Sequence, residues 1–272
     1  MMFRLLTHLS FFLAFAAAAQ AQFPVPDNAK VLFIGNSLFG SKDGGVPEYA
    51  NQAMQGMGHA GIQTGLVANW GESLEWGLTR APKFTDLQGN PANNLEAILN
   101  GPDGVPGGED WDYVVLQGFG RDDDTNNAID PSQPDGVRGD FFDAVVALHG
   151  AATQVGAETV LYMRWPNNPG VLPDFYQTTL PRFVNHYDTI AAHLGGLAVV
   201  PVALITDDLT YQNPPDTSVL PSAADRFNYL YVGDNIHQSE LAKGMFGYAV
   251  ATILMRTSPI GNPFEHGGYV NV

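Results

Sequence analysis

A serine near the start of the chain and an aspartate–histidine pair near its end are the residues best suited to chemistry. An apolar run over 31–34 is followed by Gly35, Asn36 and then Ser37. Asp234 and His237 stand three positions apart near the end of the chain. A serine hydroxyl becomes an effective nucleophile when a base removes its proton, and a carboxylate beside that base fixes its tautomer. The three residue types therefore predict a triad for acyl transfer.

Each of these residues also has an ordinary structural explanation. Asn36 and Ser37 are of the types that cap a following helix, and Asp234 with His237 fits a solvated loop. The chain contains seven histidines, of which His266 is the reserve candidate for the base. Catalysis requires that the Ser37 hydroxyl lie within hydrogen-bond reach of the His237 ring, which the structural explanations do not require.

Alternating strands and helices are expected to position the three residues. Apolar runs typical of buried parallel strands occur at 30–34, 62–68, 113–116, 159–163 and 197–205, the last with Pro201 as an edge or bulge signal. Helical spacing occurs at 47–57, 93–99, 137–155, 175–194 and 239–255. Loops are predicted at 101–110, 118–134 and 207–221. This order predicts an α/β fold with a parallel sheet covered on both faces, and ligands bind at the carboxyl edge of such sheets.

The last helix is expected to hold the base in place. Ser239 is a good N-cap residue and follows His237 by two positions. His237 is therefore predicted to project from a fixed loop and not from a mobile tail.

Composition restricts the classes of function. The chain has 272 residues, a net charge of −16 and a pI near 4.5. Such a surface repels phosphate backbones and anionic lipid, so no nucleic-acid partner is predicted. Cysteine is absent, which excludes disulfides, thiol catalysis and thiolate metal sites. Neither a phosphate-binding loop nor a dinucleotide motif occurs, so no cofactor is predicted.

The first 21 residues have the pattern of a secretory signal peptide. Arg4 and His8 precede a short apolar run, 9–19, and Ala19-Gln20-Ala21 is typical of a cleavage site. The run is too short to span a bilayer comfortably, although a permanent anchor is the alternative. We predict a signal peptide over 1–21, one mature domain over 22–272, and a secreted or periplasmic protein without stable membrane insertion.

The order of the motifs resembles the SGNH hydrolases of the GDSL esterase/lipase superfamily, over essentially the whole mature domain. The resemblance rests on Gly35-Asn36-Ser37 after a strand and on Asp234-x-x-His237 near the end. It implies a three-layer α/β/α sandwich with a flavodoxin-like parallel sheet of about five strands. It further implies Ser37 as nucleophile, His237 as base and Asp234 as acid, with the N–H groups of Ser37 and Gly71 in the oxyanion hole.

The motif after the third strand departs from the family pattern. The family has Gly-x-Asn-Asp there, whereas this chain reads Leu-Gln-Gly-Phe-Gly-Arg over 116–121. Gln117 is the nearest amide, and a glutamine side chain donates to an oxyanion as asparagine does. The missing asparagine supports one alternative, a catalytically inactive carbohydrate-binding protein on the same fold. An acyltransferase that uses the same triad is a second alternative.

Other residues carry weaker signals. Trp70 and Trp165 lie on predicted strand-end loops and are candidates to bind substrate, although buried aromatic residues are commoner than exposed ones. Asp122, Asp123 and Asp124 offer oxygen ligands for Ca²⁺ but lack the spacing of a calcium loop, so a solvated loop is the alternative. No metal is predicted in the active site.

The sequence as a whole predicts an exported serine esterase that needs no cofactor. Its partner would be a small-molecule or carbohydrate ester, either a short-chain ester or an O-acetyl carbohydrate.

Overall fold

The structure of the protein is a computed structural model that describes residues 27–40, 44–80, 92–118, 140–165, 180–212, 218–234 and 237–256. The predicted signal peptide over 1–21, the acidic run 122–124 and His266 lie outside the described residues. These three predictions therefore stay predictions.

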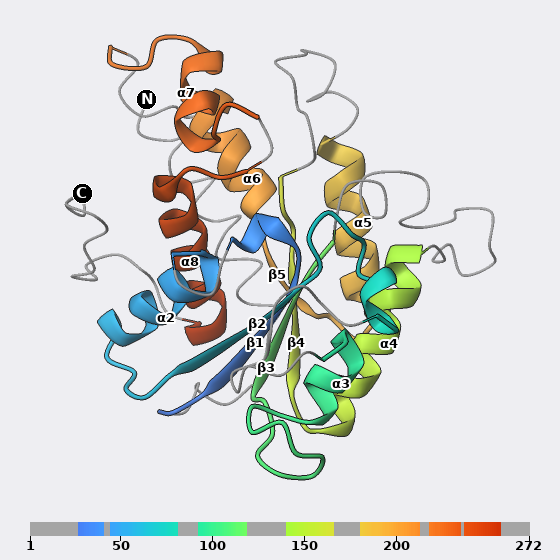
Figure 1. The fold of residues 1–272 in the computed structure, drawn as a ribbon. Helices are drawn as coiled ribbons and strands as arrows, with labels where there is room; N and C mark the ends of the chain where they lie inside the picture. Colours follow the sequence, from blue (N-terminus) through green and yellow to red (C-terminus); the bar gives the residue numbers. More distant parts are fainter. Residues whose placement is uncertain are drawn as a thin grey trace.

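Five parallel strands form one sheet in the order β2-β1-β3-β4-β5 (Figure 1). The strands are β1 (Lys30–Gly35), β2 (Gln63–Ala68), β3 (Tyr113–Gln117), β4 (Glu158–Tyr162) and β5 (Ala198–Val200). Their side chains are almost all buried because helices cover both faces. The predicted parallel sheet of about five strands is confirmed, and its strand order is that of the flavodoxin-like folds.

Two sets of helices enclose the sheet, which confirms the three-layer arrangement (Figure 1). One face carries α2 (Val46–Gly56) and α8 (Glu240–Met255). The other carries α3 (Asn94–Leu99), α4 (Asp140–Gln154) and α5 (Leu180–His193). The predicted helices are therefore present. The predicted starts at 137 and 175 lie outside the described residues, and the other ends agree to within one residue.

The helices α2 and α8, which flank the site predicted from the sequence, pack closely and share a hydrogen bond. A Cβ on Gly247 of α8 would lie 2.6 Å from Cβ of Tyr49 on α2, so the helices approach as closely as a glycine allows. The Tyr49 hydroxyl also donates to Glu240 Oε2 at 2.9 Å. Burial, with the nearby Glu240 carboxylate, raises the pKa of Tyr49 to about 12, so the phenol remains a donor at neutral pH.

The prediction of a strand over 197–205 is wrong in its second half. β5 ends at Val200, and Pro201 precedes a helix, α6 (Val202–Asp207). Proline has no N–H to donate to a strand ladder, whereas the start of a helix leaves that donor unpaired in any case. Pro201 therefore ends the strand and does not mark a bulge within it, whereas the prediction of an edge strand is confirmed because β5 is at the edge of the sheet.

Two further elements follow α6. A π-helical turn, η4 (Asp208–Gln212), lies inside the segment 207–221 that was predicted as a loop. α7 (Ala223–Leu230) was not predicted, although Ser222 and Asp225 form a capping box at its start. A serine followed by an acidic residue three positions later is a helix-start signal, so the sequence does carry an indication of this helix.

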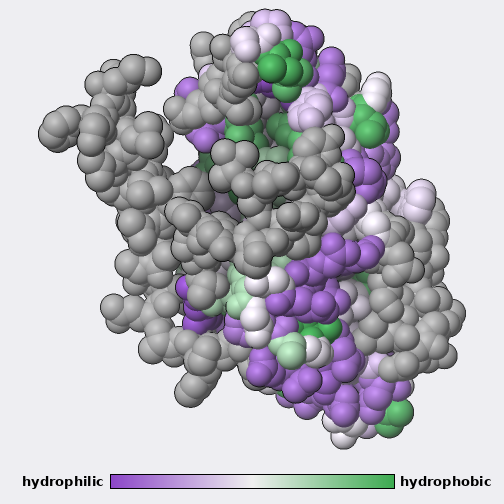
Figure 2. Space-filling view, turned by 90° about the vertical axis from the view of Figure 1, so that its left-hand side faces the viewer, coloured by the Kyte–Doolittle hydropathy of each residue, from purple (hydrophilic) through white to green (hydrophobic). Residues whose placement is uncertain are grey.

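In the part of the chain that the structure describes, no helix is both long enough and apolar enough to cross a bilayer. Figure 2 shows the molecule from the side on which α2 and α8 lie in Figure 1. Where residues are coloured, hydrophilic side chains predominate on this face and the hydrophobic ones form separate spots.

Candidate active site

Ser37 lies at the carboxyl end of β1, where the strand passes into a short 3₁₀ helix, η1 (Ser37–Phe39). Asn36 has an extended backbone, and its Oδ1 accepts a hydrogen bond from the Leu38 N–H at 2.9 Å. Asn36 is thus the cap of this turn. The Ser37 side chain is not needed for capping.

Gly35 lies so close to neighbouring side chains that the position has no space for a larger residue. A Cβ at this position would lie 2.6 Å from Gln117 Oε1 and 2.8 Å from the ring of Phe39. Any larger residue would push the Gln117 amide away from the turn that carries Ser37. The glycine therefore brings the end of β3 against the end of β1.

The loop that carries Asp234 and His237 is fixed at both ends. Tyr231 and Gln238 form an antiparallel bridge, and the Val232 N–H donates to the His237 carbonyl oxygen at 2.8 Å. Ser239 caps α8, as predicted, because its hydroxyl accepts from the Ala242 N–H at 3.3 Å. The His237 ring thus projects from an anchored backbone.

The structure brings Ser37, His237 and Asp234 together. His237 Nε2 lies 2.9 Å from Ser37 Oγ, and His237 Nδ1 lies 2.6 Å from Asp234 Oδ2. Asp234 Oδ1 also accepts from the His237 backbone N–H at 2.9 Å. A carboxylate on Nδ1 favours the tautomer with its proton there, which leaves the Nε2 lone pair facing the serine hydroxyl. The His237 and Asp234 side chains are 42% and 45% exposed, so solvent reaches the pair.

Two backbone N–H groups near this edge of the sheet have no acceptor among the described residues. They belong to Ser37 and Gly71. Gly71 lies in a turn closed by the Glu72 N–H, which donates to the Asn69 carbonyl oxygen at 3.1 Å. The strands that lead into the two positions are paired up to Gly35 and Ala68. Unpaired donors of this kind can bind an anionic oxygen.

Gln117 is the last residue of β3 and is fully buried. Neither its Nε2 nor its Oε1 has a hydrogen-bond partner among the described residues. Burial of an unpaired amide costs free energy, and such exceptions require an explanation, of which a catalytic role is one.

The two tryptophans predicted to bind substrate lie in different surroundings. Trp70 is 49% exposed and precedes Gly71. Trp165 is only 3% exposed, and its ring lies 5.9 Å from that of Phe227 and 6.4 Å from that of Tyr231. This burial does not support a substrate contact for Trp165, whose ring instead lies close to the rings of Phe227 and Tyr231.

Tyr231 is a supporting residue that the sequence did not reveal. Its ring stacks on Phe227 at 4.6 Å, and its hydroxyl lies 3.3 Å from Thr206 Oγ1. Burial raises the pKa of Tyr231 well above its usual range, so the phenol stays neutral. No signal in the sequence separates this tyrosine from other aromatic residues, because its role depends on partners from distant segments.

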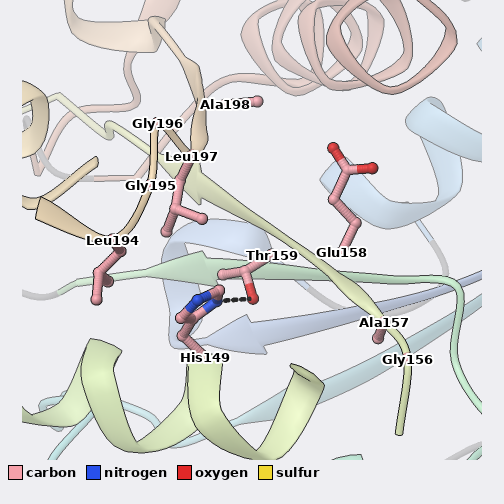
Figure 3. A pocket seen from close by; sticks show the side chains of 10 residues that line it. All are labelled: His149, Gly156, Ala157, Glu158, Thr159, Leu194, Gly195, Gly196, Leu197 and Ala198. Atoms are coloured by element: carbon pink, nitrogen blue, oxygen red, sulfur yellow. Dashed lines mark hydrogen bonds between the residues drawn. The ribbon is translucent and has the colours of Figure 1, made fainter. Parts of the chain in front are cut away.

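A cavity of about 410 Å³ lies at the opposite edge of the sheet, where β4 and β5 begin (Figure 3). His149 and Thr159 face each other in it, with His149 Nδ1 3.0 Å from Thr159 Oγ1. Because Ser37 lies at the carboxyl edge, we do not assign this cavity to the candidate active site. Among the described residues, no group of three His, Cys, Asp or Glu side chains is placed to hold a metal ion.

No model of a known protein family matches the sequence, and no relative was found among curated proteins. Solved structures are similar. One is described as a GDSL-like lipase from Parabacteroides merdae, with 10% identity and a TM-score of 0.55 over 86% of this chain and 99% of that chain. Another is the acetylxylan esterase Axe2 from Geobacillus stearothermophilus, with 13% identity and a TM-score of 0.51 over 88% and 99%. A third is TesA, with 17% identity and a TM-score of 0.50 over 83% and 97%.

These identities establish the fold alone. The chain has the α/β/α fold of the SGNH hydrolases, as its resemblance to them predicted.

Proposed function

We propose that the protein is a serine esterase of the SGNH type, in which Ser37, His237 and Asp234 form the catalytic triad. The observation that carries the proposal is the continuous chain of contacts from Asp234 Oδ2 through the His237 ring to Ser37 Oγ, at 2.6 and 2.9 Å. The fold shared with a GDSL-like lipase and an acetylxylan esterase supports the assignment of an ester substrate.

The reaction follows from the position of each group. His237 Nε2 takes the proton of Ser37 Oγ while that oxygen attacks the acyl carbon, and Asp234 stabilises the imidazolium that results. The tetrahedral intermediate collapses when His237 gives the proton to the leaving alcohol, which leaves an acyl group on Ser37. Water then attacks the acyl carbon with His237 again as base, and the acid is released.

The negative oxygen of each intermediate needs donors. The N–H groups of Ser37 and Gly71 are available, since neither has an acceptor among the described residues. We propose the Gln117 amide as the third donor, in place of the asparagine of the family. Its Nε2 has no hydrogen-bond partner within the residues that the structure describes, and its side chain packs against Gly35, two residues before the nucleophile.

The proposed substrate is a short-chain or O-acetyl carbohydrate ester, and we propose that the protein is exported through its signal peptide to reach it. Trp70 is exposed beside Gly71, where an indole ring is suited to stack on a sugar. The His237 and Asp234 side chains are 42% and 45% exposed, so a substrate can approach the pair from solvent.

Hydrolysis of p-nitrophenyl acetate and butyrate by the mature protein and by Ser37→Ala tests this proposal. Activity that is lost in the variant, while its circular dichroism is unchanged, is the expected result. Equal activity in the two proteins would contradict the triad. A wild-type protein that hydrolyses neither these esters nor acetylated sugars would favour the inactive carbohydrate-binding protein, to which the missing asparagine points.

A further inference from the structure

Asn94, the first residue of α3, contacts the loop that follows β2 at two points. Its Oδ1 accepts a hydrogen bond from Asn69 Nδ2 at 3.2 Å. Its Nδ2 donates to the Leu74 carbonyl oxygen, also at 3.2 Å. The amide can be oriented in only one way, because a carbonyl oxygen cannot donate to another carbonyl oxygen. A single side chain therefore binds both ends of residues 69–74, which we call the Gly71 loop.

The direction of the Gly71 N–H depends on how this loop is held. Gly71 has a φ of +74° at the third position of the turn that Asn69 opens, the arrangement of a type II turn. Its N–H belongs to the central peptide of that turn. The Asn69 N–H also donates to the Gly35 carbonyl oxygen at 2.9 Å, which ties the turn to the strand end that leads into Ser37.

The side chains of Asn69 and Asn94 are buried and almost out of contact with solvent. Asn94 is fully buried and Asn69 is 1% exposed. A Cβ on Gly77 would lie 2.3 Å from the Nδ2 atoms of both, so the next turn of the chain packs directly on them. Hydrogen bonds in such surroundings are stronger than in water, and their loss leaves buried groups unpaired.

We propose that Asn94 is a positioning residue of the oxyanion hole: it holds both ends of the Gly71 loop and thereby aims the Gly71 N–H at the oxyanion. The proposal rests on the proposed function. Asn94 acts through Asn69 and Leu74 and touches no reacting atom. Because the bond to an oxyanion is fully made only in the transition state, a misdirected donor lowers kcat and leaves KM nearly unchanged.

Asn94→Ala removes both hydrogen bonds and is the direct test. We expect kcat for p-nitrophenyl acetate to fall about 10- to 100-fold, somewhat less than the roughly 10²- to 10³-fold cost of losing an oxyanion donor. KM should stay within about twofold. Amide hydrogen exchange in residues 69–74 should become faster. Asn94→Asp, of the same size, keeps the acceptor for Asn69 and loses the donor to Leu74, so it serves if the alanine variant does not fold.

Thr159→Val is the matched control. It too removes a hydrogen bond made by a buried side chain, but at the other edge of the sheet, and its kcat should not change. Unchanged kcat in the Asn94 variants, or unchanged exchange in the Gly71 loop, would overturn the proposal. If the wild-type protein hydrolyses no ester, the proposed function fails. Hydrogen exchange in residues 69–74 then decides on its own whether Asn94 holds the loop.

Discussion

Two histidines of this protein contact a hydroxyl group at nearly the same distance, at opposite edges of one sheet. His237 Nε2 lies 2.9 Å from Ser37 Oγ at the carboxyl edge. His149 Nδ1 lies 3.0 Å from Thr159 Oγ1 at the amino edge (Figure 3). The distance alone does not separate a nucleophile and its base from an ordinary structural contact.

The surroundings of the two pairs differ in three ways. His237 has Asp234 on its other ring nitrogen, whereas His149 has no carboxylate partner among the described residues. Ser37 lies in a turn after its strand, beside N–H groups that have no acceptor in the described part of the chain. Thr159, in contrast, lies within β4 and pairs with Val114 in the sheet. The third difference concerns the two histidine rings. The His237 side chain is 42% exposed. In contrast, burial lowers the pKa of His149 and so favours its neutral form.

The comparison shows what turns a hydroxyl–histidine contact into a candidate for catalysis. A carboxylate must fix the tautomer of the base, and donors must face the place where negative charge develops. Only the carboxyl edge of the sheet combines these features within the described residues.

Replacement of Asp234 by asparagine should have the largest effect on the carboxyl-edge pair. The amide nitrogen can face His237 Nδ1 only if that nitrogen gives up its proton, so Nε2 carries it and cannot act as base. Loss of the carboxylate in such triads costs about 10⁴-fold in kcat. Steady-state kinetics on p-nitrophenyl acetate measure this, with unchanged thermal stability as the control. A loss below threefold would show that the carboxylate is not part of the site.

Gln117→Met tests the proposed third oxyanion donor. Methionine has a similar length and no donor, so kcat should fall by about 10²-fold. The melting temperature should stay the same or rise, since the variant removes a buried amide that has no described partner. Undiminished kcat would remove Gln117 from the oxyanion hole, and the remaining donors would be the backbone N–H groups.

Trp70→Ala tests whether Trp70 stacks on a sugar group of the substrate. An aromatic contact with a sugar contributes modestly, so KM for an acetylated xylo-oligosaccharide should rise about three- to tenfold. KM for p-nitrophenyl acetate, which has no sugar, should not change. Trp70→Phe keeps an aromatic ring and should restore most of the affinity. Equal effects on the two substrates would exclude a sugar-stacking role.

His149→Gln should have the smallest effect, and on stability alone. Because burial lowers the pKa of His149, the unfolded chain binds a proton more readily than the folded one at acidic pH. Stability therefore falls as the pH drops through the ordinary histidine pKa of about 6.5. The variant should lose less stability than the wild type between pH 7.5 and 5.5 in urea unfolding. An identical pH dependence would show that His149 does not contribute to it.

The sequence predicted the fold well where a pattern repeats. Continuous apolar runs gave the buried strands, and Ser239 correctly marked the start of α8. It failed after β5, where the apolar run continued through Pro201 into a helix. Periodicity does not separate a buried strand from a short buried helix. Pro201 correctly indicated an edge strand, since β5 lies at the edge of the sheet, but it did not show that the strand ends there.

The contacts of the candidate site were only partly open to prediction. The residue types of Ser37, Asp234 and His237 suggested their partnership, but the 2.9 Å contact between Ser37 and His237 depends on how distant segments pack. The Asn94–Asn69 contact gave no signal at all, because a buried asparagine in a sequence looks like any other. Local patterns therefore predict elements and residue types, whereas long-range hydrogen bonds become visible only in the folded chain.

The most direct test is the site of covalent labelling by diethyl p-nitrophenyl phosphate. An activated serine displaces p-nitrophenol and keeps the diethyl phosphoryl group, which peptide mass spectrometry locates. The account predicts one adduct per chain, on Ser37, that is absent in Ser37→Ala and forms much more slowly in Asp234→Asn. Labelling of another residue at the same rate, or no labelling of the folded wild-type protein, would contradict the claim that Ser37 is an activated nucleophile.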